Sequence, residues 1–310
     1  MTQTSSPATL SVWFSAARPK TLPLALTSIV TASALAYSEG AFSLPVALLA
    51  LLTATLLQIL SNLANDYGDA EKGTDNENRV GPMRAVQSGA VSLATMRKAI
   101  AINVLLTIAS GLALVTYSLD SLHNVIVFCG LGILAIGAAI AYTMGSKPYG
   151  YVGLGDVSVF TFFGLLGVLG TYFLHTGTLS MMTILPAIGC GLLSVAVLNV
   201  NNMRDIENDA ECGKRTVAVR LGLEGAKRYH YLLVISGIAS LMVTNLVLAT
   251  PVWLLTAWFI ALVVTRGHLR VVQQAKQAHE LAPQLPQMVK CALVSNLVFV
   301  LLTIFTLFVS

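Results

Sequence analysis

Two polar stretches rich in aspartate and asparagine each follow a long apolar segment of this 310-residue chain, over residues 62–73 and 202–213. Six of their side chains have ligand-binding chemistry: Asn62, Asp66 and Asp69 in the first stretch, and Asn202, Asp205 and Asp209 in the second. In a helix, the three positions of each set share one face, because they are separated by three or four residues. The spacing therefore predicts two helix faces that each carry two carboxylates and an amide.

The two stretches repeat one design. A shift of 140 positions places Asn62 on Asn202, Asn65 on Asp205, Asp69 on Asp209 and Gly73 on Gly213. Four carboxylates in one pocket would repel each other and raise each other's pKa, and a hard divalent cation relieves that repulsion. Mg²⁺ takes oxygen ligands and typically combines a few carboxylates with substrate phosphates. The pattern therefore predicts Mg²⁺ bridging the four aspartates to a diphosphate.

Composition indicates that this site belongs to a membrane protein. The chain is 55% hydrophobic and only 10% charged, with a mean hydropathy of +0.77, whereas soluble domains carry about 25% charged residues. Long apolar segments recur from end to end, so we expect an all-α integral membrane protein embedded in a lipid bilayer. The first 17 residues hold no Lys or Arg and no cleavage signal, so we expect no signal peptide. Nothing suggests a nucleic-acid partner.

Nine apolar runs predict nine transmembrane helices in one bundle. Their approximate bounds are 21–38, 43–65, 97–117, 122–142, 154–174, 181–203, 229–249, 251–266 and 288–309. With a cytoplasmic N-terminus, all 18 Lys and Arg residues fall in cytoplasmic segments or at cytoplasmic helix ends, as the positive-inside rule requires. This predicts a periplasmic C-terminus and puts both aspartate stretches on the cytoplasmic face of a bacterial inner membrane.

We expect a single transmembrane domain over residues 1–310. Within it, residues 1–17 form a polar tail, and residues 66–96 and 204–228 form cytoplasmic active-site loops. The first of these loops is long for a compact bundle, and such loops are usually functional or disordered. Its mixed charge and its position beside the aspartates suggest a lid or phosphate contacts.

Cations and one tyrosine flank the predicted diphosphate site. The candidates are Arg18, Lys72, Arg84, Lys147 and Lys214, together with Tyr142. Lys147 lies in a glycine-rich loop whose amides suit an oxyanion. Arg18 and Lys147 could instead serve only to set the topology. Gln58 lies one turn before Asn62, and we interpret it as a partner in hydrogen bonds between helices.

The ligand must suit both a polar membrane face and an apolar bundle. A polyprenyl diphosphate does, because its diphosphate would bind at the cytoplasmic face and its tail would lie among the helices. Bound metal would draw charge from the leaving diphosphate. The allylic C–O bond would then ionise, and an electron-rich acceptor would attack the carbocation in a site that excludes water.

Two aspartate-rich segments after the second and sixth of nine helices, with Tyr142 and Lys147 between them, resemble the UbiA-type intramembrane prenyltransferases. The resemblance covers essentially the whole chain. More narrowly, five segments resemble the menaquinone-pathway branch of that superfamily, the 1,4-dihydroxy-2-naphthoate polyprenyltransferases. These segments are 18–21, 62–69, 81–84, 147–156 and 201–209.

This resemblance implies an activity and a role for each matching residue. It implies transfer of a polyprenyl group to 1,4-dihydroxy-2-naphthoate with loss of the carboxylate, giving demethylmenaquinone. It also implies residue roles: Mg²⁺ and diphosphate on Asp66, Asp69, Asp205 and Asp209, with Asn62, Asn65 and Asn202 beside them, and Tyr142 and Lys147 near the diphosphate or the cation. The sequence departs from the wider pattern at Gly73 and Gly213, which leaves the number of metal ions open.

Two alternatives stay open. The 4-hydroxybenzoate branch of ubiquinone biosynthesis shares this chemistry, so the acceptor pocket decides between the two branches. A secondary transporter could also show an internal repeat. However, the two repeated stretches have the same orientation, and their acids lie at helix ends rather than at the midplane where coupling ions bind.

Overall fold

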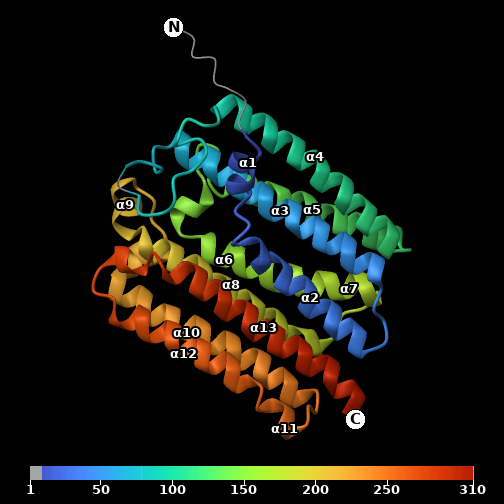
Figure 1. The fold of residues 1–310 in the computed structure, drawn as a ribbon. Helices are drawn as coiled ribbons and strands as arrows, with labels where there is room; N and C mark the ends of the chain where they lie inside the picture. Colours follow the sequence, from blue (N-terminus) through green and yellow to red (C-terminus); the bar gives the residue numbers. More distant parts are fainter. Residues whose placement is uncertain (1–8, 78, 310) are drawn as a thin grey trace.

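The computed structural model describes residues 9–77 and 79–309, and that part of the chain is helical with no β-strand (Figure 1). The long helices are α2 (Leu22–Ser38), α3 (Leu44–Glu71), α4 (Leu93–Ser118), α5 (Leu122–Ala141), α8 (Ile184–Arg204), α10 (Val217–Val247), α12 (Trp258–Gln274) and α13 (Gln284–Val309). A further span is composite and consists of α6 (Gly155–Val159), the π-helix η2 (Phe160–Gly170) and α7 (Thr171–Thr176). The short helices are α1 (Leu10–Ala17), η1 (Tyr149–Val152), η3 (Met181–Thr183), α9 (Ile206–Glu211), α11 (Val252–Leu255) and η4 (Ala278–Leu281).

Eight helical segments of the described chain are long and apolar enough to cross a membrane. The helices α1 and α2, which meet at a bend of 54°, make a ninth when they are counted as one span. These segments coincide with the nine apolar runs, so the predicted all-α membrane fold is confirmed. The protein is a multi-pass membrane protein.

Proline residues or side-chain caps mark the starts of several helices. Pro23 and Pro45 lie in the first turns of α2 and α3, where a missing N–H has no intrahelical partner to lose. Ser92 and Thr216 cap α4 and α10 by accepting hydrogen bonds from backbone amides three residues later. Each cap satisfies a donor that the first helical turn would otherwise leave unpaired.

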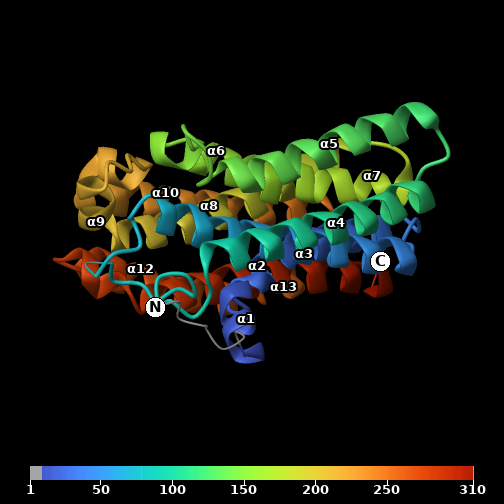
Figure 2. The ribbon, with the colours of Figure 1, turned by 90° about the horizontal axis from the view of Figure 1, so that it is seen from above.

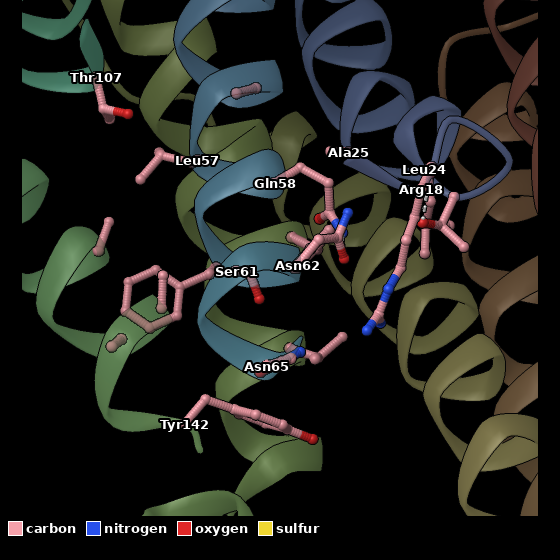
Figure 3. A pocket seen from close by; sticks show the side chains of 18 of the residues that line it. Arg18, Leu24, Ala25, Leu57, Gln58, Ser61, Asn62, Asn65, Thr107 and Tyr142 are labelled. Atoms are coloured by element: carbon pink, nitrogen blue, oxygen red, sulfur yellow. Dashed lines mark hydrogen bonds between the residues drawn. The ribbon is translucent and has the colours of Figure 1, made fainter. Parts of the chain in front are cut away.

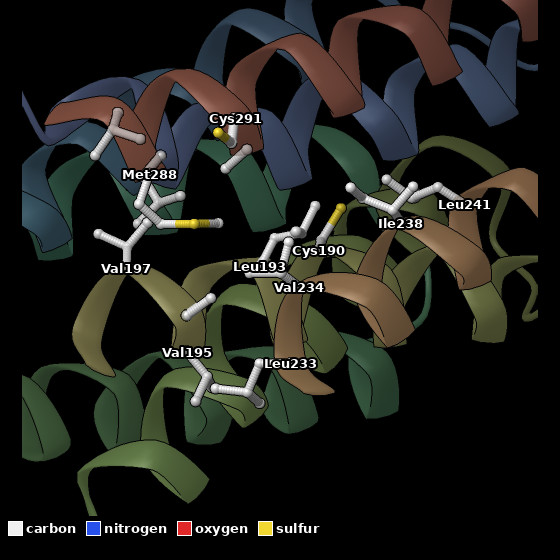
Figure 4. Packing of buried hydrophobic residues seen from close by; sticks show 14 of the residues in the cluster. Cys190, Leu193, Val195, Val197, Leu233, Val234, Ile238, Leu241, Met288 and Cys291 are labelled. Carbon is white, nitrogen blue, oxygen red and sulfur yellow. The ribbon is translucent and has the colours of Figure 1, made fainter. Parts of the chain in front are cut away.

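The helices form one bundle around α8. This helix packs against η2, α10 and α13, whereas α3 packs against α2, α4 and α5 on the other side of the molecule (Figures 1 and 2). Figure 4 shows the core between α8, α10 and α13, where apolar side chains such as Leu193, Val234 and Met288 are fully buried. Glycine lets η2 approach α8 closely, since a Cβ at Gly164 would lie 2.7 Å from the Cα of Gly191.

Two element boundaries differ from the predicted loops. Helix α3 continues to Glu71, so Asp66 and Asp69 lie in helix rather than in the expected 66–96 loop. Likewise, the expected 204–228 loop contains α9 and the start of α10. The second polar stretch is not one continuous helix, because the backbone leaves helical geometry at Asp205 (φ −101°, ψ 16°) between α8 and α9.

The ends of α3 and α9 lie at one end of the bundle, and the C-terminus lies at the other (Figure 1). Which end faces the cytoplasm stays a prediction from the placement of positive charge. We expect a reporter fused after Ser310 to give a periplasmic signal, and a reporter placed in the loop between α3 and α4 to give a cytoplasmic one. A cytoplasmic signal from the C-terminal fusion would contradict this topology.

Candidate active site

Both aspartate stretches end in the same glycine turn. Gly73 and Gly213 adopt positive φ angles of 73° and 72°, a conformation that glycine adopts with little strain. In each case the next backbone amide returns to the carbonyl of an aspartate: Thr74 to Asp69 at 2.9 Å, and Lys214 to Asp209 at 2.7 Å. The repeat seen in the sequence is therefore a repeat of local structure.

The two stretches meet directly. The side-chain amide of Asn208 donates a hydrogen bond to the carbonyl oxygen of Thr74 at 2.9 Å. The ammonium of Lys214 lies 3.9 Å from a carboxylate oxygen of Asp69 and 3.6 Å from one of Asp209. One cation therefore joins acids that are 140 residues apart in the chain.

The loop after α3 folds back over these acids. Asp66 accepts hydrogen bonds from the backbone amides of Ala85 (3.1 Å) and Val86 (3.2 Å). Arg84 donates to Asp69 at 2.6 Å and to the carbonyl oxygen of Asn65 at 2.9 Å. Because Asp66 holds the loop backbone, it also fixes the position of Arg84 over Asp69.

Three further charged residues, Asp75, Arg79 and Arg204, pair with this centre and were not among our candidates. Asp75 is buried and pairs with Arg84 at 2.9 Å and with Arg79 at 3.2 Å. Arg204 donates to Asp205 at 2.9 Å, and Arg79 lies 4.0 Å from the same carboxylate. A buried charge is costly unless it is paired, so these arginines stabilise the acid-rich centre. The spacing of Asp75 and Arg79, four residues apart, is a sequence signal that could have indicated such a pair.

A cavity of about 980 Å³ opens beside the charged centre. At its polar end it is lined by Arg18, Asn62, Asp66, Asp69, Arg84 and Lys214. Deeper in the bundle it is lined by apolar side chains, among them Ile29, Leu57, Val115, Phe128, Phe163 and Leu174. The cavity thus joins a charged head region to an apolar body, as an amphiphilic ligand requires.

The junction of α1 and α2 forms part of the polar wall. Asn62 donates a hydrogen bond to the carbonyl oxygen of Ala17 at 2.9 Å, and the following residue, Arg18, has a positive φ of 52°. Figure 3 shows the Arg18 side chain extending into the cavity toward Asn65. Its Nη2 is buried and has no hydrogen-bond partner among the described residues. Arg18 therefore offers a free donor to an anionic group.

Tyr142 lies at the end of α5 and lines the cavity. Its ring packs edge-to-face on that of Tyr149, with centroids 5.4 Å apart. A Cβ at Gly155 would lie 2.8 Å from the Tyr142 hydroxyl oxygen, and one at Gly150 would lie 2.6 Å from its carbonyl oxygen. These glycines therefore make room for Tyr142, whereas the sequence suggested that this glycine-rich loop binds an oxyanion.

The structure does not bring every candidate to the cavity. Asn65 and Asn202 line it, whereas Asp205, Asp209, Lys72 and Lys147 do not. Lys72 donates to the carbonyl oxygen of Gly145 at 2.9 Å, and Lys147 is exposed. Tyr151, which we did not select, donates to Asp69 at 2.7 Å.

Residues 25–285 match the model of the UbiA prenyltransferase family. The chain belongs to this family. Membership makes it a prenyltransferase, as the two aspartate stretches suggested. The match begins in α2 and ends in α13, so it includes the cavity except for the part lined by α1, the α1–α2 junction and the start of α2.

Two named bacterial enzymes are similar to almost the whole of this chain. The 1,4-dihydroxy-2-naphthoate octaprenyltransferase of Haemophilus influenzae is 48% identical over 293 residues, which is 94% of this chain and 94% of that protein. The protein of the same name from Escherichia coli is 48% identical over 93% of this chain and 94% of its own length.

Solved structures share the fold at low sequence identity. A UbiA homolog from Aeropyrum pernix in its apo form has a TM-score of 0.62 at 16% identity, with 88% of this chain and 97% of that chain covered. A UbiA homolog from Archaeoglobus fulgidus bound to DMAPP and Mg²⁺ has a TM-score of 0.60 at 16% identity, with 94% and 99% covered. At these identities the likeness supports the fold alone.

Proposed function

We propose that this prenyltransferase transfers a polyprenyl group from an allylic polyprenyl diphosphate to 1,4-dihydroxy-2-naphthoate, with loss of the carboxylate, giving demethylmenaquinone. The observation that carries the proposal is the cavity, which joins buried acids and cations to an apolar body. The names of the two relatives at 48% identity support the naphthoate acceptor and an eight-unit prenyl chain. We place the enzyme in a bacterial inner membrane, as one domain over residues 1–310, with its active site on the cytoplasmic side.

The donor chemistry of the polar end fits Mg²⁺. Asp69 and Asp209 are both buried and lie within 4 Å of one ammonium, that of Lys214. Asp66 and Asp205 are buried beside them, and carboxylate oxygens are ligands that Mg²⁺ prefers. In the described part of the chain no three acids already form a compact cation site, because arginines and a lysine lie between them. We therefore propose that these four aspartates hold the ion together with the diphosphate.

The cations of the site bind the leaving group. Arg84 and Lys214 form ion pairs with Asp69. Diphosphate oxygens bound beside Asp69 would therefore lie within reach of both cations. Arginine can bind phosphate oxygens through two parallel hydrogen bonds, and lysine supplies a point charge. Bound Mg²⁺ would supply Lewis acidity that helps the diphosphate leave with the electron pair of the C–O bond.

The apolar body of the cavity binds the tail and excludes water. Exclusion of water protects the allylic cation until a ring carbon of the acceptor attacks it. Tyr142 lines the cavity, and an aromatic face stabilises a nearby cation. We propose that Lys72 and Lys147, which lie outside the cavity wall, assist only from the loops around the diphosphate.

The protonation of Asp209 gives this metal site a pH dependence. Burial, opposed by Lys214 and reinforced by Asp205 and Asp69, raises the pKa of Asp209 to about 6. Below that pH the carboxyl carries a proton that Mg²⁺ must displace. We expect the half-saturating Mg²⁺ concentration to rise as the pH falls below about 6, by up to about tenfold per pH unit. Calorimetric titration from about pH 8 to pH 5 would measure it, and an unchanged constant would contradict this role of Asp209.

A turnover assay in detergent tests the proposed function. The protein receives Mg²⁺, an allylic polyprenyl diphosphate and either 1,4-dihydroxy-2-naphthoate or 4-hydroxybenzoate, and the products are identified by mass spectrometry. We expect a prenylated, decarboxylated naphthoquinol from the first acceptor and no product from the second. Product from 4-hydroxybenzoate alone would keep the fold and the metal site but overturn the acceptor. No product from either, with folded protein, would contradict the proposal.

A further inference from the structure

Gln58 carries an open hydrogen-bond acceptor on the wall of the cavity. It lies in α3, one turn before Asn62, and lines the cavity together with Arg18. Its Oε1 is buried and has no hydrogen-bond partner among the described residues. From the sequence we interpreted Gln58 as a partner in hydrogen bonds between helices, but its amide bonds within α3, to Asn62. A buried amide oxygen without a donor is costly, so a donor from a ligand would stabilise it.

A short chain of hydrogen bonds fixes which atom of Gln58 is free. The carbonyl oxygen of Ala17 can only accept, so Asn62 must present its Nδ2 to it, at 2.9 Å. Asn62 then presents Oδ1 to Gln58, which must donate its own Nε2, at 3.4 Å. The remaining atom, Oε1, is an acceptor with no donor function. The orientation of both amides therefore follows from the Ala17 carbonyl.

The adjacent side chain, Arg18, carries an unpaired hydrogen-bond donor rather than an acceptor. Arg18 follows Ala17, and its Nη2 is a buried donor without a partner. Figure 3 shows Arg18, Asn62 and Gln58 together on one side of the cavity. A ligand that satisfies both groups must carry a hydrogen-bond donor beside an anionic group. An ionised diphosphate and a prenyl tail have no hydrogen to donate to Gln58, whereas a ring with a hydroxyl and a carboxylate has both functions.

We propose that Gln58 is a specificity-determining residue that accepts a hydrogen bond from a ring hydroxyl of the aromatic acceptor. This inference rests on the proposed function, since it takes the acceptor to be a hydroxylated aromatic acid. A site that hydrogen-bonds a substrate hydroxyl rejects an analogue that lacks it, because its own polar group is then left unpaired. Gln58 would thus orient the ring and select for its hydroxyl group.

The test compares the wild type with Gln58→Met, which keeps an unbranched side chain of similar length and removes the amide. We expect KM for 1,4-dihydroxy-2-naphthoate to rise about tenfold, the effect of one lost hydrogen bond in a buried site. KM for the allylic diphosphate should change by less than about twofold, because the diphosphate donates no hydrogen bond to Gln58. Gln273→Met is the matched control, because Gln273 is exposed on α12 and outside the cavity.

Two acceptor analogues make the test specific. Inhibition constants are measured for 1-hydroxy-2-naphthoate and 4-hydroxy-2-naphthoate, each of which lacks one ring hydroxyl. One analogue lacks the hydroxyl that donates to Gln58. It should bind the wild type about tenfold more weakly than the substrate, and its affinity should not fall further in Gln58→Met. A purely structural role for Gln58 would weaken both analogues equally.

The outcomes separate this inference from the proposed function. Wild-type protein that makes no product from 1,4-dihydroxy-2-naphthoate would overturn the proposed function and this inference with it. Wild-type turnover with an unchanged acceptor KM in Gln58→Met, or with equal changes in both KM values, would overturn the inference alone. Gln58→Leu repeats the measurement if the methionine variant does not fold, and thermal unfolding in detergent reports folding for each variant.

Discussion

Replacing Asp69 or Asp209 with asparagine should lower kcat by about 10²–10³-fold, the range seen when a charge-stabilising group is lost from a catalytic centre. Asparagine keeps the size of the side chain, and in place of Asp69 it can still accept from Tyr151 or Arg84, so the bundle should still fold. It removes the negative charge that a divalent cation needs, and the two positions lie around the same ammonium of Lys214. Steady-state turnover of each variant measures the effect.

Asp120→Asn is the matched control for these variants. Asp120 is an exposed carboxylate in the connection between α4 and α5, away from the charged centre. We expect this variant to keep wild-type turnover. Near-normal turnover in both Asp69→Asn and Asp209→Asn, with all three variants inserted and folded, would make the two acids structural rather than catalytic.

Removing Mg²⁺ should abolish turnover. The diphosphate leaves with a high negative charge, and we propose that the ion bound by the aspartates stabilises that charge, an effect worth several kcal/mol. Excess EDTA should therefore reduce product to background, and added Mg²⁺ should restore it. Ca²⁺ prefers more ligands at longer distances, so we expect it to restore less activity than Mg²⁺. Full turnover in excess EDTA would contradict the metal-bridging mechanism.

The fold could be predicted because a lipid environment leaves the backbone few choices. Each apolar run must satisfy its own amides and carbonyls, so it forms a helix, and the nine runs match the observed spans. The repeat between the two aspartate stretches also predicted local structure, since Gly73 and Gly213 end both stretches with the same turn. These are local features, and a sequence expresses them directly.

The remaining features depend on contacts between distant segments. The sequence alone does not show that Arg84 donates a hydrogen bond to Asp69, because that contact depends on the path of a loop. The face of α3 that carries Gln58 borders a cavity, and an amide on a helix looks the same beside a cavity as beside a neighbouring helix. Lys147 was selected for its charge, whereas its loop carries it to an exposed position. Tyr151, from the same loop, reaches Asp69 instead.

The central claim is that the two aspartate stretches form one Mg²⁺-dependent diphosphate site. The most direct test is the binding of an unreactive prenyl thiodiphosphate to the wild type, Asp69→Asn and Asp209→Asn, with Mg²⁺ and with EDTA, measured by calorimetry. We predict that Mg²⁺ strengthens binding to the wild type by at least about tenfold and that either substitution removes this gain. Equal affinity with Mg²⁺ and with EDTA, or a Mg²⁺ gain that survives in one variant, would contradict a single site shared by both stretches.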